Sequence, residues 1–120
     1  MSKKEQSEAR KAIRSKIFSA QAMKPASIIT QFNGADIEVR QPTVGTILDF
    51  RQAEDGDRKQ MMIDMFIRYC FVPGTDEAVF EEGDLADLVQ MPFGKDYTNL
   101  QEVISKLSNV NLAEASATKN

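Results

Sequence analysis

The residues of this chain whose grouping could support chemistry are carboxylates. Four of them stand together just before an apolar helical pattern: Glu81, Glu82, Asp84 and Asp87. Such a group could hold a metal ion or share a proton in acid–base chemistry. Carboxylates are also favoured at the positive N-terminal end of a helix. We interpret this cluster as helix-terminal charge with a solvated face.

A second acidic stretch, Asp55-Gly56-Asp57, resembles the opening of a calcium-binding loop. Alternating positions of that loop must supply oxygen ligands. Lys59 stands where the next ligand is required, so the pattern fails. The glycines are isolated from one another and form no phosphate-binding loop.

The sequence also offers few groups for nucleophilic catalysis. The chain has no histidine, which removes the commonest general base and every Ser-His or Cys-His arrangement. The single cysteine, Cys70, excludes an internal disulfide and lies in an apolar run. We interpret it as a small buried hydrophobe, because a reactive thiol needs an electropositive and partly exposed setting. The sequence therefore predicts a non-enzymatic protein without metal or cofactor.

The bulk composition predicts a single soluble domain. The chain has 120 residues, of which 42% are apolar and 28% charged. No apolar run approaches the roughly 18 residues needed to span a bilayer, and the N-terminus does not resemble a secretory signal. We therefore expect a cytoplasmic protein with no membrane partner.

Charge is distributed unevenly along the chain. Residues 1–24 carry seven basic and two acidic side chains, a net charge of +5, whereas residues 25–120 carry eight basic and sixteen acidic side chains, a net charge of −8. A basic arm on an acidic body is typical of a protein that interacts with other molecules. The arm could attract nucleic acid, an acidic partner, or the acidic body of a neighbouring copy in a homo-oligomer.

The basic arm, residues 1–24, is predicted to be helical over residues 2–22. Ser2 and Glu5 have the spacing of a capping box. The apolar positions form one narrow stripe, with Phe18 beside it: Ala9, Ile13, Ile17 and Ala20. So thin a stripe leaves the helix marginal by itself. We therefore predict that Ile13 and Ile17 contact a partner or the body.

Residues 27–42 carry the clearest local signal, a β-hairpin. Asn33-Gly34 fits a two-residue type I′ turn between two alternating runs. The expected cross-strand pairs, all on one largely apolar face, are Phe32–Ala35, Thr30–Ile37 and Ile28–Val39. The opposite face is mostly polar, so this register buries one face of the hairpin.

Four helical patterns follow the hairpin. The first begins at Thr43 as N-cap and is broken by Gly56, and the second, capped by Asp57, covers about residues 58–71. The others cover about residues 81–90 and 95–109. The predicted fold class is α+β: a small, mostly helical domain with one N-terminal hairpin packed on three to four helices. The predicted organisation is the arm, one globular domain over residues 25–111, and a disordered tail over residues 112–120.

The helix over residues 58–71 is apolar nearly all round and rich in methionine. Methionine fills irregular cores, but it also adapts at promiscuous binding surfaces. Helical spacing favours the core, and the alternative is a groove shared with the last helix. The residues in question, which we predict as partner-binding candidates, are Met61, Met62, Met65, Phe66 and Tyr69.

Three passages together resemble a known family. They are IEVRQPTVGTILDFRQA, MMIDMFIRYCFVPGTDEAVFEEGDLADLVQMPFG and DYTNLQEVISKLSNVN. The passages give a strand and a short helix, then a central apolar helix followed by an acidic helix start, and last an amphipathic helix. In this order of elements the chain resembles the small tail assembly chaperones of tailed bacteriophages and prophages.

The resemblance implies a non-enzymatic chaperone in the cytoplasm of the bacterial host. Such proteins bind the tape measure protein and the tail tube protein, keep them soluble during tail assembly, and are absent from the mature virion. Two alternatives stay open. One is a small structural tail or connector subunit whose arm docks on the next copy. The other is a small DNA-binding regulator, which the arm favours less, because it has one aromatic residue and no base-reading motif.

Overall fold

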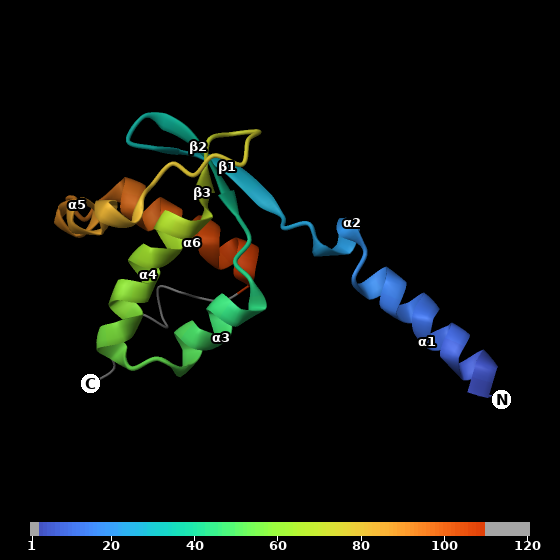
Figure 1. Cartoon of the computed structure of the whole chain (residues 1–120). Helices are drawn as coiled ribbons and strands as arrows, with labels where there is room; N and C mark the ends of the chain where they lie inside the picture. Colours follow the sequence, from blue (N-terminus) through green and yellow to red (C-terminus); the bar gives the residue numbers. More distant parts are fainter. Residues whose placement is uncertain (1–2, 110–120) are drawn as a thin grey trace.

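The computed structural model describes residues 3–109 and has an α+β fold (Figure 1). Its elements, in chain order, are α1 (Lys3–Ile17), α2 (Ala20–Met23), β1 (Ser27–Phe32), β2 (Ala35–Arg40), α3 (Val44–Gln52), α4 (Asp55–Tyr69), β3 (Cys70–Phe71), the 3-10 turn η1 (Glu82–Asp84), α5 (Leu85–Gln90) and α6 (Lys95–Ser108). The three strands form one antiparallel sheet in the order β1-β2-β3. No helix in this part of the chain is both long enough and apolar enough to cross a membrane.

The predicted hairpin and its register are confirmed. Asn33 and Gly34 have φ angles of 51° and 84°, as the two central residues of a type I′ turn require. The pairs Phe32–Ala35, Thr30–Ile37 and Ile28–Val39 are all present. Phe32, Ile37 and Val39 are buried while Ile29 on the opposite face is exposed, so the predicted inner face is the correct one.

The methionine-rich helix ends two residues earlier than predicted. α4 stops at Tyr69, and Cys70 and Phe71 form β3, which pairs with Val39 and Glu38 of β2. The predicted hairpin is therefore part of a three-stranded sheet. The physical reason is that β2 would otherwise present an unpaired edge. The backbone carbonyl of Cys70 in turn accepts a hydrogen bond from the N–H of Val79, at 3.0 Å.

The start of α4 also differs from the prediction. The N-cap is Glu54 rather than Asp57, and Gly56 lies in the first turn of α4 instead of breaking the preceding helix. Arg58 explains the early restart. Its guanidinium donates to the carbonyls of Phe50 and Arg51 at 3.1 and 2.9 Å, so it satisfies the C-terminal end of α3 from the first turns of α4.

The other helix boundaries agree more closely with the sequence. Thr43 caps α3, and its Oγ1 accepts a hydrogen bond from the Thr46 N–H at 3.2 Å. The helix predicted over residues 81–90 is divided into η1 and α5. α6 ends at Ser108, and its C-cap Asn109 has a φ of 55°, the left-handed conformation that commonly ends a helix.

The core lies between the sheet, α4 and α6. Its fully buried side chains are Phe50, Phe66, Met62, Met65, Leu100, Ile104, Val39 and Cys70. Two polar contacts attach α6 to the hairpin. Asn99 donates to Thr30 Oγ1 at 2.8 Å, and the Asn33 N–H donates to Asp96 Oδ1 at 2.9 Å. These contacts fix the last helix against the sheet, which in turn sets its distance from α4.

The N-terminal helix projects from this body. In Figure 1, α1 leaves at the end opposite α5, and residues 7–18 are all exposed. The radius of gyration is 18.0 Å, against about 14 Å for a compact chain of this length. The helix predicted as continuous over residues 2–22 is interrupted at Ser19, which caps α2 by accepting from the Ala22 N–H at 3.1 Å. The predicted cap residue Ser2 and the predicted tail over residues 112–120 lie outside the described residues.

Candidate partner-binding groove

Four of the five predicted contact residues on α4 belong to the core. Met62, Met65, Phe66 and Tyr69 are buried between the sheet, α3 and α6, and Met61 is half-buried. Because α4 is covered on several sides, its apolar circumference is used mainly in packing. The structure does not bring these residues together with Ile13 and Ile17, which lie exposed on α1.

Tyr69 shows why the buried end of α4 is fixed. Its hydroxyl lies 2.6 Å from Thr46 Oγ1 and accepts from the Thr43 N–H at 3.3 Å. Burial raises the pKa of Tyr69, but the hydrogen bonds from Thr43 and Thr46 and the charge of Arg68 outweigh it, and the net pKa is lowered. This network joins α4 to the N-terminus of α3.

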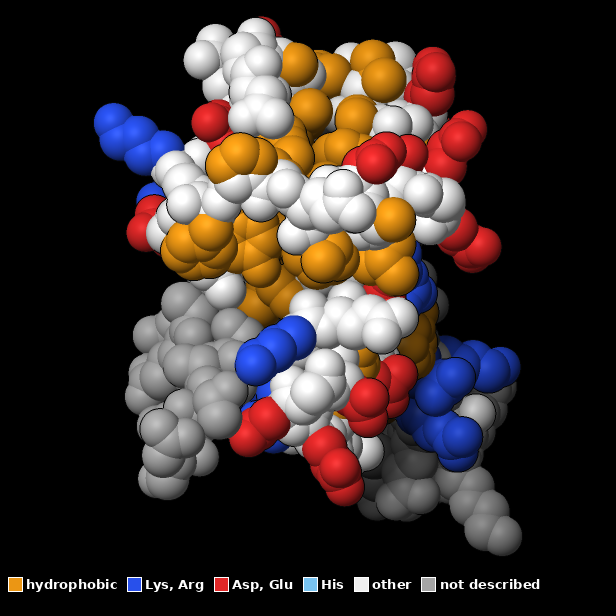
Figure 2. Space-filling view, turned by 90° about the vertical axis from the view of Figure 1, so that its left-hand side faces the viewer, with side chains coloured by type: hydrophobic (Ala, Val, Ile, Leu, Met, Phe, Trp, Pro, Cys, Tyr) orange, Lys and Arg blue, Asp and Glu red, His pale blue; other side chains and the backbone are white. Residues whose placement is uncertain are grey.

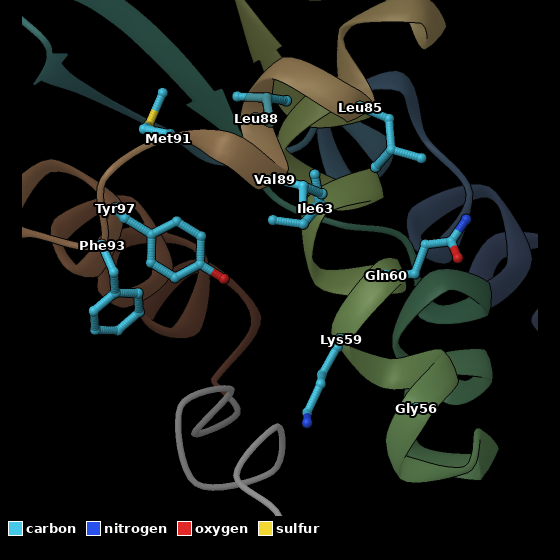
Figure 3. A pocket seen from close by; sticks show the side chains of 10 residues that line it. All are labelled: Gly56, Lys59, Gln60, Ile63, Leu85, Leu88, Val89, Met91, Phe93 and Tyr97. Carbon is cyan, nitrogen blue, oxygen red and sulfur yellow. The ribbon is translucent and has the colours of Figure 1, made fainter.

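An apolar groove lies on the other side of α4, toward α5 and α6. Its volume is about 500 Å³. The residues that line it are Gly56, Lys59, Gln60, Ile63, Leu85, Leu88, Val89, Met91, Phe93 and Tyr97. Figure 3 shows Phe93 and Tyr97 on one side, and Lys59 and Ile63 of α4 on the other, with Val89 of α5 next to Ile63. The groove is therefore bordered by the methionine-rich helix and the last helix, but none of the five contact candidates on α4 lines it.

The groove wall is continuous with the core through stacked rings. The ring of Tyr97 meets the buried ring of Phe66 edge-on, with centroids 5.3 Å apart and an interplanar angle of 70°. On its other side, Tyr97 packs against Phe93 at 5.1 Å. Aromatic pairs at such distances are attractive beyond the area that they bury. The exposed wall of the groove is thus attached to a rigid interior.

Two large side chains of the groove are unusually exposed. Val89 is 64% exposed and Phe93 is 80% exposed. Figure 2 shows the face on which α5 lies, with apolar side chains gathered across its middle. Single exposed apolar residues are common, but a hollow lined by several of them is typical of an interaction site.

Acidic side chains flank this groove. Lys59 is the only charged side chain among the described residues that line it. A neighbouring cleft, which shares Gln60 with the groove, is lined by Met61 and three carboxylates: Asp49, Asp57 and Asp64. A second cleft shares Leu85 with the groove and includes Asp64 and Glu82 together with Arg68. An apolar segment with basic side chains at its edges would complement this surface.

Cys70 and the acidic cluster Glu81, Glu82, Asp84 and Asp87 do not line the groove. Cys70 is fully buried, and burial raises the pKa of its thiol to about 12, as expected for a structural cysteine. Glu81 and Asp84 form a reciprocal capping box at η1, in agreement with their interpretation as helix-terminal charge. Among residues 3–109, no three acidic or cysteine side chains are close enough together to hold a metal ion.

Sequence reasoning missed the exposed residues of the groove. Leu88 and Val89 both read as the apolar side of a helix, yet Leu88 is buried and Val89 is not. Phe93 stands between Pro92 and Gly94, which mark a short turn. An aromatic residue in such a turn was the signal that could have indicated an exposed apolar side chain. Val89 and Phe93 line the groove because α4 and α6 leave space beside them.

Comparison with known proteins identifies one structural likeness. No family model and no curated protein sequence matches the chain. Among solved structures, the fold is similar to that of the tail assembly chaperone of bacteriophage HK97, with a TM-score of 0.53. The two are 13% identical, and the match covers 83% of this chain and 96% of the other. At this identity the likeness is one of fold.

Proposed function

We propose that this chain is a non-enzymatic tail assembly chaperone of a tailed bacteriophage or prophage. In this role it binds an apolar helical segment of the tape measure protein in the groove between α4, α5 and α6. The observation that carries the proposal is that Phe93 and Val89 stand exposed on a groove whose wall is stacked against the core. The likeness of fold and the resemblance of three sequence passages support it.

The groove suits a holding function because it is largely apolar and open to solvent. An amphipathic helix inserts anchors spaced by three or four residues into such a groove. Met91 adds a flexible, polarisable side chain that adapts to different anchors. Coverage of apolar stripes would prevent them from associating with one another, which keeps a long helical protein soluble.

The predicted contact residues take different roles in this proposal. Met62, Met65, Phe66 and Tyr69 support the groove from the core, and Phe66 does so directly through Tyr97. Met61 lines the adjoining acidic cleft. Contact with the tail tube protein, action in the host cytoplasm and absence from the mature virion are parts of the same proposal.

The test is a tagged pull-down from cells that express the whole neighbouring gene cluster, with mass spectrometry of the proteins that co-purify. The proposal expects a very long helical tape measure protein and a tube subunit. Recovery of neither, with the tagged chain itself folded and abundant, would overturn it.

One observation favours a second candidate, a structural tail or connector subunit. The exposed α1 could dock on the next copy in a ring, as such subunits do. Mass spectrometry of purified virions separates the two functions, since a structural subunit is present in stoichiometric amount and a chaperone is not.

A further inference from the structure

The arm has an apolar stripe that no other described residue of the chain covers. Ile13 and Ile17 of α1 lie one helical turn apart and are 58% and 55% exposed, with Phe18 exposed beside them. A lone helix of 15 residues is marginal in water. The arm therefore gains stability wherever this stripe finds an apolar surface.

In the structure the arm lies away from the groove of its own chain (Figure 1). The arm is anchored beside the sheet, where the N–H of Gln41 donates to the carbonyl of Ala26 at 2.8 Å and the N–H of Ala26 donates to the side chain of Gln41 at 3.2 Å. From this anchor α1 runs away from the end of the body at which α5 lies (Figure 1). The stripe is therefore available to a surface of another molecule.

Charge indicates which surface that is. The described part of α1 presents Arg10, Lys11, Arg14 and Lys16, all exposed, beside the apolar stripe. The groove is apolar apart from Lys59 and Gln60. The clefts on its flanks carry four carboxylates, Asp49, Asp57, Asp64 and Glu82, against one basic side chain, Arg68. A basic amphipathic helix and an apolar groove with acidic flanks are complementary in both respects.

We propose that α1 of one copy docks through Ile13 and Ile17 into the α4–α5–α6 groove of a second copy. The contact is head-to-tail, because arm and groove are different surfaces of each copy. Since the proposed function places the tape measure segment in the same groove, self-association and partner binding exclude one another. The arm is then a built-in competitor that covers the groove until a better-fitting helix displaces it.

The direct test is disulfide cross-linking between two variants of the full chain. An Ile17→Cys variant is mixed with a differently tagged Val89→Cys variant and oxidised. The matched control replaces Val89→Cys by Val44→Cys, since Val44 is also exposed but lies on α3, outside the groove. Native Cys70 stays in every variant because it is fully buried.

The proposal expects the Ile17–Val89 pair to form a mixed dimer in clear excess over the Ile17–Val44 pair. Equal yields from the two pairs would overturn it.

Sedimentation of the purified chain gives an independent measurement. Ile13→Glu/Ile17→Glu should weaken self-association by about tenfold or more. The control Ser7→Glu/Ser15→Glu adds the same charges away from the stripe and should leave self-association unchanged.

These measurements use the purified chain alone. They can therefore refute the arm–groove contact without refuting the proposed function. Capture of the tape measure protein without arm-dependent association would leave the chaperone proposal and remove this inference. If the chain both captures the tape measure protein and associates through its arm, Ile13→Glu/Ile17→Glu should capture more tape measure protein than the wild type. A loss of capture would mean that the arm contacts the partner directly, and would contradict the competition.

Discussion

The rings of Phe93 and Tyr97 pack with their centroids 5.1 Å apart, at an interplanar angle of 46°, although Phe93 is largely exposed to solvent. Tyr97 is held from behind by the buried ring of Phe66. Phe93 is thus an exposed aromatic side chain with a fixed support. A binding surface that is ordered before its ligand arrives loses less entropy on association.

The two phenylalanines that contact Tyr97 should differ sharply in what they contribute. Phe66→Ala removes a buried ring and should lower the free energy of unfolding by about 3–5 kcal/mol. Phe93→Ala removes an exposed ring and should lower it by less than about 1 kcal/mol, while weakening partner capture. Urea denaturation and the pull-down measure the two effects. Equal losses of stability would contradict the exposure of Phe93.

Met61 and Met65 test whether α4 is core or contact surface. Met65 is fully buried, so Met65→Ala should cost about 2–5 kcal/mol of unfolding free energy. Met61 is half-buried beside the acidic cleft, and Met61→Ala should cost about 1 kcal/mol or less. Thermal unfolding by circular dichroism compares the two. A Met65→Ala protein as stable as the wild type would show that the core is assigned wrongly.

The hydroxyl of Tyr69 should stabilise the junction of α3 and α4. Tyr69→Phe removes the 2.6 Å contact with Thr46 Oγ1 and the bond to the Thr43 N–H, and should cost about 1–2 kcal/mol. Tyr97→Phe is the control, because the Tyr97 hydroxyl has no hydrogen-bond partner among residues 3–109. Chemical denaturation of both variants measures the difference, and an unchanged Tyr69→Phe protein would argue against the network.

Glu38 should make the fold sensitive to acid. Its carboxylate accepts from the Gly74 N–H at 2.8 Å and from Arg40 at 3.3 Å. The Gly74 hydrogen bond, together with Arg40, lowers the pKa of Glu38 below its ordinary value of 4.5, against the opposing effect of desolvation. A lowered pKa in the folded state gives stability that is present above pH 4.5 and is lost as the pH falls through the folded-state value.

The measurement is urea denaturation of the wild type and Glu38→Gln from about pH 6 to about pH 3. Glu38→Gln should be less stable at the upper end and should lose less stability on acidification. If both proteins respond to pH identically, Glu38 does not bind a proton more weakly in the folded state.

Local signals in the sequence were enough for the hairpin and most helices. Asn33-Gly34 fixes the turn and with it the register of six residue pairs. β3 could not be predicted in this way. Cys70 and Phe71 continue an apolar helical pattern, and only the unpaired edge of β2, far away in the sequence, draws them into the sheet.

The same limit applies to the candidate site. Helical spacing made Met61, Met62, Met65, Phe66 and Tyr69 candidates without indicating which elements would cover them. The sheet, α3 and α6 cover four of the five. The exposure of Val89 and Phe93 depends on how α5 and the turn before α6 sit beside α4, which residue spacing alone does not contain.

The most direct test of the central claim is the amount of soluble tape measure protein in cells that co-express it with this chain. The wild type and Val44→Glu should keep the tape measure protein soluble. Val89→Glu puts the same charge into the groove and should leave the tape measure protein in the insoluble fraction, while the variant itself stays folded. If Val89→Glu solubilises the tape measure protein as well as the wild type does, the groove is not the holding site. If the wild type has no effect, the chain is not its chaperone.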